Sequence, residues 1–105
     1  MTWSMWLDDQ LDDPATPSRR VPEGFFGAKS TVEALVLIAK MGMPNFIDFD
    51  FDLGDNDTAL SFLYELQFRY PVGPFFDYAV HSKNVYAKQT IDSFVSSWKR
   101  SAEMG

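Results

Sequence analysis

The sequence predicts a compact α/β domain built around a short, mostly parallel β-sheet. Short apolar stretches of strand length alternate along the chain with stretches in which the apolar residues have helical spacing. This order implies βαβ units joined by right-handed crossovers, and therefore parallel strands. The chain has 105 residues, of which 46% are hydrophobic, so it suits a single domain, residues 1–105, with one core.

The first predicted strand, residues 3–7, ends abruptly in Asp8 and Asp9. An apolar stretch followed by acidic residues is typical of a buried strand whose C-terminal end opens into a site. Residues 10–24 contain several prolines and a glycine, which predict a long loop near that site.

A second short strand begins at residues 25–26 and leads into the first predicted helix. Ser30 and Glu33 have the spacing of a capping box, and apolar residues with helical spacing follow them. Gly42 is expected to end this helix, because glycine readily adopts the left-handed conformation that terminates many helices.

Residues 46–53 alternate between apolar and acidic side chains, which predicts a strand with one apolar face. The other face carries Asp48, Asp50 and Asp52. Asp48 lies one step deeper in the sheet than Asp50, and burying it without a partner would be costly. We do not expect it to bind a metal directly, and its role stays open.

The second half of the chain predicts a helix, a strand and a final helix. Asn56 or Asp57 can cap the first of these helices. Residues 75–80 form the last predicted strand and run into His81. Residues 91–98 have apolar side chains at helical spacing and predict the final helix.

Composition excludes several classes of function. The chain has no cysteine, so it cannot form a disulfide, a thiolate zinc site or a cysteine nucleophile. A formal net charge of −6 argues against binding in the groove of duplex nucleic acid, because that mode needs a basic face, but small phosphorylated ligands remain possible. No apolar run approaches the roughly 20 residues of a membrane span, and no signal peptide is recognisable, so we expect a soluble cytoplasmic protein.

The acidic residues after the first and third strands predict a metal site. The carboxyl ends of parallel strands meet at one edge of a sheet, and Mg²⁺ needs only a few carboxylates because it keeps several waters. We expect Mg²⁺ or Mn²⁺ to be held by Asp8, Asp9 and Asp50, with Asp52 shaping the turn or contributing through its backbone or a water. The alternative is a set of N-cap and turn aspartates, which are common where strands lead into helices.

The residues after the last predicted strand suggest a second wall of the site. His81, the one histidine of the sequence, could act as general acid or base near neutral pH. Ser82 could donate a hydrogen bond to a phosphoryl oxygen, and Asn84 could orient it. A Ser-His-Asp triad is a weaker interpretation, because adjacent residues at a strand end point apart and no nucleophile-elbow motif accompanies them.

Three cations are candidates for binding the phosphate: Lys83, Arg19 and Arg20. The alternative for each is a solvent-exposed charge that aids solubility. The glycine motifs of nucleoside triphosphate and dinucleotide sites are not present in the sequence.

Three segments together resemble a known family: WLDD (6–9), FDFDLG (49–54) and HSKN (81–84). Their order and spacing over nearly the whole chain are similar to those of the cyclic-phosphate-processing receiver domains, distant relatives of response-regulator receivers. The resemblance implies a flavodoxin-like three-layer sandwich with a sheet of about four strands.

The resemblance also implies roles for individual residues. Asp8 and Asp9 would bind metal, Asp50 would occupy the phosphoacceptor position, and Ser82 would stand where receivers sense phosphate. The chain after Ser82 reads as one loop and one helix, so we expect it to lack the fifth strand of ordinary receivers and its phosphate-binding lysine. The implied substrate is a cyclic phosphate, either a 2′,3′-cyclic RNA end or a cyclic nucleotide.

Three functions stay open at this point. The first is a Mg²⁺-dependent phosphoesterase in which Asp50, His81 and Ser82 are catalytic. The second is a non-catalytic module that sequesters a cyclic nucleotide signal, as in a phage or bacterial counter-defence protein. The third is a degenerate receiver that acts through protein contacts of Trp3, Trp6 or the final helix. Nothing in the sequence indicates an oligomeric state.

Overall fold

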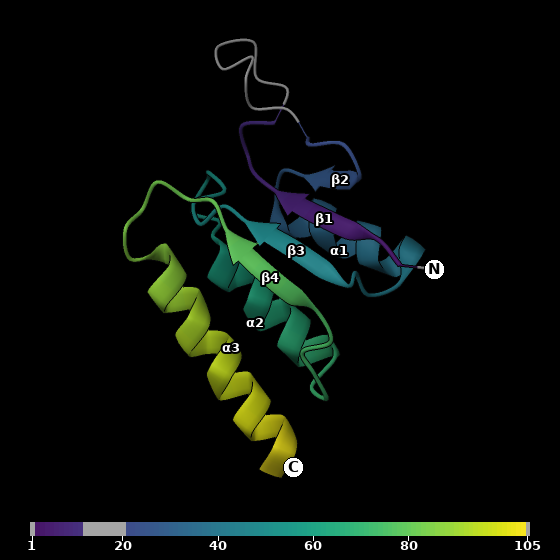
Figure 1. The fold of residues 1–105 in the computed structure, drawn as a ribbon, viewed down its shortest axis with the longest axis vertical. Coiled ribbons are helices and arrows are strands. Elements are labelled where there is room, and N and C mark those ends of the chain that lie inside the picture. The colour runs from purple at the N-terminus through teal and green to yellow at the C-terminus, as the bar shows by residue number, and fades with distance from the viewer. Residues whose placement is uncertain (1, 12–20, 105) are drawn as a thin grey trace.

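The computed structural model describes residues 2–11 and 21–104 and has the predicted α/β architecture (Figure 1). One four-stranded, wholly parallel sheet has the strand order β2-β1-β3-β4. The strands are β1 (Ser4–Leu7), β2 (Phe25–Ala28), β3 (Phe46–Phe49) and β4 (Asp77–Val80). The helices are α1 (Thr31–Met41), α2 (Ala59–Arg69) and α3 (Ala87–Met104).

The four strands end level with one another. Leu7 at the end of β1 pairs in register with Ala28 of β2 and with Phe49 of β3, and Phe49 pairs with Val80 of β4. The residues that follow β1, β3 and β4 therefore emerge at the same edge of the sheet, where parallel α/β folds bind ligands.

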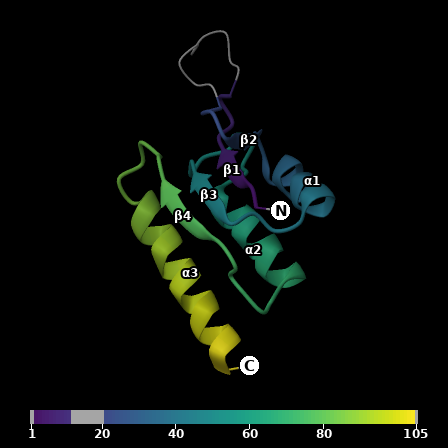
Figure 2. The same cartoon turned by 45° about the vertical axis from the view of Figure 1, so that its right-hand side comes forward.

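All three helices contribute to one core on one face of the sheet. Alternate residues of β1 and β3 are fully buried, with no measurable exposure: Met5, Leu7, Ile47 and Phe49. They join a single cluster with apolar residues of α1, α2 and α3. Figure 1 shows α1 and α2 behind the sheet, and both Figure 1 and Figure 2 show α3 running alongside β4 and α2.

The predicted receiver-like α/β fold is confirmed, with a four-stranded parallel sheet and three helices in the part of the chain that the structure describes. Within it, the opposite face of the sheet carries no helix, and Trp6 and Asp48 on that face are only partly buried. The physical reason is that β2, β3 and β4 each lead into a helix and their crossovers share one hand, which places α1 and α2 on the same side.

Helix α1 begins and ends as the sequence predicts. The side chain of Ser30 accepts a hydrogen bond from the Glu33 N–H (3.1 Å), and Glu33 in turn accepts from the Lys29 N–H (3.1 Å). Gly42 follows the last turn with a φ of 85°, a backbone conformation that residues other than glycine rarely adopt. Both helix ends are thus satisfied by local groups.

The predicted cap of α2 is wrong. Thr58, not Asn56 or Asp57, is the N-cap and accepts from the Ser61 N–H at 3.3 Å. Asp57 instead accepts hydrogen bonds from the backbone N–H (2.8 Å) and hydroxyl (2.7 Å) of Thr31. Asp57 therefore ties the loop before α2 to the first turn of α1, where a carboxylate is favoured by the helix dipole.

Strand β3 is shorter than the predicted 46–53. It ends at Phe49, and Asp52 makes only an isolated bridge with Thr58. The Asp52 carboxylate accepts from the Gly54 N–H at 3.0 Å, and Gly54 has a φ of 77°. Local turn bonds thus overrule the strand periodicity after residue 49.

Helix α3 is fixed to the edge of the sheet by polar and apolar contacts. The Tyr78 hydroxyl of β4 donates to the Asp92 carboxylate, which also accepts from the Lys88 ammonium at 2.7 Å. Lys88 and Tyr78 lower the pKa of Asp92, while burial and the bond to Asp92 raise the pKa of Tyr78.

In the described residues, α3 and the other helices are not long and apolar enough to span a membrane.

Candidate functional site

The polar residues after β1, β3 and β4 meet at the carboxyl edge of the sheet, as predicted. Their backbone N–H groups extend the hydrogen bonding of the sheet by one residue: Asp8 donates to Ala28 (2.9 Å), Asp50 to Leu7 (2.8 Å) and His81 to Phe49 (2.8 Å). The three side chains therefore start from positions that the sheet fixes. Such rigid support is what a binding or catalytic site requires.

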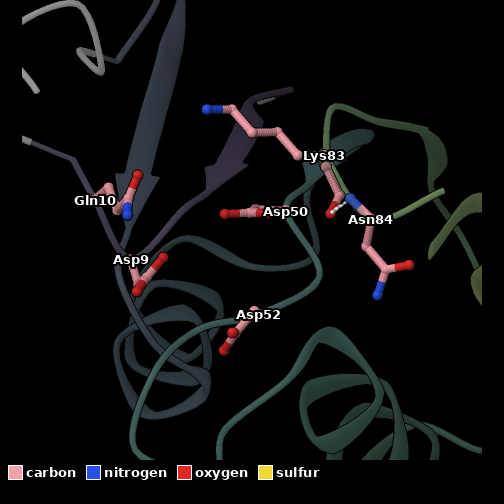
Figure 3. Close-up of a pocket in the computed structure, with 7 residues that line it drawn as sticks. Asp9, Gln10, Asp50, Asp52, Lys83 and Asn84 are labelled. Atoms are coloured by element: carbon pink, nitrogen blue, oxygen red, sulfur yellow. Dashed lines mark hydrogen bonds between the residues drawn. The ribbon is translucent and has the colours of Figure 1, made fainter. Parts of the chain in front are cut away.

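A polar pocket of about 340 Å³ opens at this edge (Figure 3). Its lining combines acidic, hydroxyl, amide and cationic side chains: Asp9, Gln10, Asp50, Asp52, Ser82, Lys83 and Asn84. In Figure 3 the carboxylates of Asp9 and Asp50 point toward one another, and the Lys83 side chain extends across the view above Asp50. The size is at the low end of the range for small-molecule sites.

Most of the predicted site residues line this pocket, and Gln10 is an addition that sequence reasoning missed. Asp8 and His81 do not line it. The middle of the predicted loop 10–24, with Arg19 and Arg20, lies outside the described residues, so their expected role in phosphate binding stays a prediction.

Asp8, Asp50 and His81 form a compact group that shares Asp50 with the pocket. One ligand atom from each lies within 4.8 Å of the others. Asp8 is 1% exposed and Asp50 is 9% exposed. One oxygen of each carboxylate is held by a backbone N–H, from Gln10 to Asp8 (2.9 Å) and from Phe51 to Asp50 (2.8 Å). Two buried carboxylates beside an imidazole are a donor set that suits a divalent cation.

Asp48, which the sequence left unexplained, binds His81. Its Oδ1 atom lies 2.6 Å from His81 Nδ1, and the Trp6 ring stacks on the imidazole with centroids 4.1 Å apart and an interplanar angle of 11°. The register of strands β1, β3 and β4 brings these residues together. Trp6, Asp48 and Ala79 are paired across β1, β3 and β4, and His81 follows Ala79 by two residues on the same face.

Ser82 and Asn84 shape the loop between β4 and α3. The Ser82 hydroxyl oxygen accepts from the Asn84 N–H at 3.1 Å, and Asn84 Oδ1 accepts from the Tyr86 N–H at 2.9 Å. Because Ser82 accepts in this bond, its O–H can donate to an oxygen of a bound ligand.

Asp9 carries the electrostatic strain of the acidic cluster. Burial raises the pKa of its carboxyl, and the charges of Asp50, Asp8 and Asp52 raise it further. The ionised form of Asp9 is therefore less favourable in the folded protein than in the unfolded chain.

Asp9→Asn is expected to raise the melting temperature by a few degrees at pH 7 in a chelator. The reason is that a raised folded-state pKa makes the charged carboxyl destabilising above that pKa. The gain should shrink as the pH falls through the pKa of Asp9, where the wild-type carboxyl also becomes neutral. Thermal unfolding across pH measures this, with Asp77→Asn, an exposed site on β4, as control. Equal melting temperatures for Asp9→Asn and wild type at pH 7 would contradict it.

Comparison with known families agrees with the resemblance noted in the sequence. The family model described as "Cyclic-phosphate processing Receiver domain" matches residues 3–97 of the 105-residue chain. The match includes all four strands and every described residue of the pocket and of the Asp8, Asp50 and His81 group. Searches of curated proteins and of solved structures find no significant match.

Proposed function

The chain belongs to the family of cyclic-phosphate processing receiver domains, and from this membership we propose that its pocket hydrolyses a cyclic phosphate with the help of a divalent cation. One observation supports this above all. The same pocket is lined by three carboxylates, those of Asp9, Asp50 and Asp52, and by the hydroxyl, ammonium and amide groups of Ser82, Lys83 and Asn84. This arrangement suits a phosphate that is shared between a cation and neutral or cationic donors.

The buried residues fit a cation. Asp8 and Asp50 offer carboxylate oxygens, and Asp50 also lines the pocket. Beside them, His81 Nε2 is a buried nitrogen that has no hydrogen-bond partner among the described residues. A bound divalent ion, Mg²⁺ or Mn²⁺, would neutralise the carboxylates and polarise a phosphoryl oxygen. We therefore assign Asp8 and Asp50 as the principal carboxylate ligands, with Asp9 and Asp52 at the pocket wall.

The remaining pocket residues supply positioning and proton transfer. The Ser82 O–H donates to a non-bridging phosphate oxygen, and the Lys83 ammonium balances its charge. Asp9, whose carboxylate lines the pocket, accepts the proton of the attacking water. The water oxygen bonds to phosphorus as the ring P–O bond breaks. The leaving oxygen takes up a proton from solvent water, Asp9 releases its proton to solvent, and the product is a phosphate monoester.

His81 has a different position from the one expected of a general acid. Its Nε2 atom is buried and lies 3.4 Å from Asp8 Oδ2, and the residue is not part of the pocket lining. A proton donor must reach the substrate oxygen directly or through one water. We therefore propose Asp9, and not His81, as the residue that accepts the proton of the attacking water.

The test is a substrate panel followed by product analysis. Purified protein is incubated with RNA carrying a 2′,3′-cyclic phosphate end, with 2′,3′-cyclic mononucleotides and with 3′,5′-cyclic nucleotides, in Mg²⁺, in Mn²⁺ and in chelator. We expect metal-dependent formation of a phosphate monoester from at least one of them, seen by ³¹P NMR. No turnover of any substrate would refute hydrolysis, and a cyclic ligand that binds but is recovered intact would identify a sequestering module instead.

A further inference from the structure

We propose that His81 is itself a metal ligand, through Nε2, and that the site consequently binds the transition ions Mn²⁺ and Co²⁺ more tightly than Mg²⁺. The inference deepens the proposed function, since it concerns the cation of the same pocket. It rests on the geometry around the imidazole and can be tested without any substrate.

The contact with Asp48 determines which tautomer His81 adopts. A distance of 2.6 Å between Nδ1 and Asp48 Oδ1 is that of a strong hydrogen bond in which the ring nitrogen donates to the carboxylate. A proton on Nδ1 leaves the lone pair of a neutral imidazole on Nε2. Carboxylate–imidazole pairs of this kind commonly hold metal-binding histidines in the required tautomer and increase the basicity of the ligating nitrogen.

The Nε2 atom of His81 lies in surroundings that suit a cation. This atom is buried and has no hydrogen-bond partner in residues 2–11 and 21–104. Asp8 Oδ2 lies 3.4 Å from it, which is longer than the roughly 2.7–2.9 Å of a charge-assisted hydrogen bond. A lone pair facing a carboxylate oxygen is repulsive, and a cation shared with Asp8 and Asp50 removes that repulsion.

The imidazole of His81 is held rigidly in place. The imidazole is held by Asp48 at one nitrogen and by the stacked Trp6 ring at its face, and the His81 backbone N–H is bonded to the end of β3. Ligand atoms of Asp8, Asp50 and His81 already lie within 4.8 Å of one another. Little reorganisation is therefore needed to bring them to a common ion.

The donor set determines the choice of ion. Magnesium prefers oxygen ligands, whereas imidazole nitrogen favours later divalent ions, whose affinities rise along the Irving–Williams series. One nitrogen and two carboxylate oxygens should therefore bind Co²⁺ more tightly than Mn²⁺, and both more tightly than Mg²⁺.

The decisive measurement is pulsed electron paramagnetic resonance of Mn²⁺ bound to the untagged protein. His81 is the one histidine of the chain, so any imidazole ¹⁴N modulation of the Mn²⁺ signal must come from it. We expect this modulation in the wild type and its loss in His81→Gln. Bound Mn²⁺ without imidazole modulation would overturn the proposal and would favour an imidazolium that bridges Asp48 and Asp8.

Calorimetric titrations with Co²⁺ and Mg²⁺ test the ion preference and the role of Asp48. His81→Gln should weaken Co²⁺ binding at least about tenfold and Mg²⁺ binding less. Asp48→Asn should weaken Co²⁺ binding about 10–100-fold while keeping the ¹⁴N modulation, because Asp48 acts through the imidazole. Asp92→Asn on α3 is the control and should leave both affinities unchanged. Equal loss for both ions in His81→Gln would contradict the preference.

The inference and the proposed function fail in different ways. Imidazole modulation without turnover of any cyclic phosphate would leave the metal site standing and refute the hydrolase. Turnover with Mg²⁺ in a protein whose bound Mn²⁺ shows no imidazole modulation would do the reverse.

Discussion

Trp98→Ala is expected to lower the free energy of unfolding by about 3–5 kcal/mol, the range for removing a buried tryptophan. Trp98 is 1% exposed and heads the fully buried side chains in volume. Its ring packs against Phe76 with centroids 6.2 Å apart, and its indole N–H donates to the Pro71 carbonyl at 3.1 Å. The substitution removes both the packing of α3 on the core and a satisfied polar group. Small domains have only about 5–15 kcal/mol of stability in total.

Urea denaturation of two further variants separates these contributions. Trp98→Phe keeps most of the apolar volume and loses the indole hydrogen bond, so its cost should be clearly smaller than that of Trp98→Ala. Phe68→Ala removes an aromatic ring that is 85% exposed on α2 and should change stability by no more than about 0.5 kcal/mol. Equal losses in Trp98→Ala and Phe68→Ala would show that α3 does not hold the core together.

Asp50→Asn is expected to reduce metal-dependent turnover of the cyclic phosphate by at least about 100-fold. This loss exceeds the one that is typical when a residue hydrogen-bonded to a metal ligand is substituted. Asp50 is the residue that the pocket and the Asp8 and His81 group have in common. The amide keeps the size of the side chain and an oxygen that can accept from the Phe51 N–H. It removes the negative charge that binds the cation, so the effect reports on charge and not on shape.

The matched control is Asp77→Asn, which removes a carboxylate at the opposite end of β4 and should leave turnover unchanged. In chelator, Asp50→Asn should lower the pKa of Asp9, because the charge of Asp50 raises it in the wild type. Turnover retained by Asp50→Asn in Mg²⁺ and Mn²⁺ would exclude this carboxylate from the reaction.

Local rules predict the elements of this fold well. The capping box of Ser30 and Glu33, and Gly42 after α1, are found as expected because a helix end is satisfied by groups a few residues away. The parallel sheet follows from the alternation of strands and helices. Local rules fail where two local signals compete, as after Phe49, where turn bonds of Asp52 replace the strand that alternation predicted.

The pocket was predictable to a similar degree. Asp9, Asp50 and Ser82 follow strands whose ends must meet at one edge of a parallel sheet, so their convergence needs no knowledge of packing. Gln10 was missed because it lies in the segment predicted as loop, and its place in the pocket depends on how the chain leaves β1. The sequence also separates Asp48 from Asp50 only by depth in the sheet, which indicates no partner.

The sequence by itself determined the family, the parallel strands, the ends of α1 and the acidic edge of the sheet, since these depend on residue type and short-range spacing. Only the tertiary structure decided that Asp48 binds His81, that Asp57 ties the loop before α2 to Thr31, and that the helices share one face of the sheet in its described part. The first two contacts join residues that are 33 and 26 positions apart, so they depend on strand register and helix packing. Register is set by which side chains the whole core can bury together, and no local pattern contains that information.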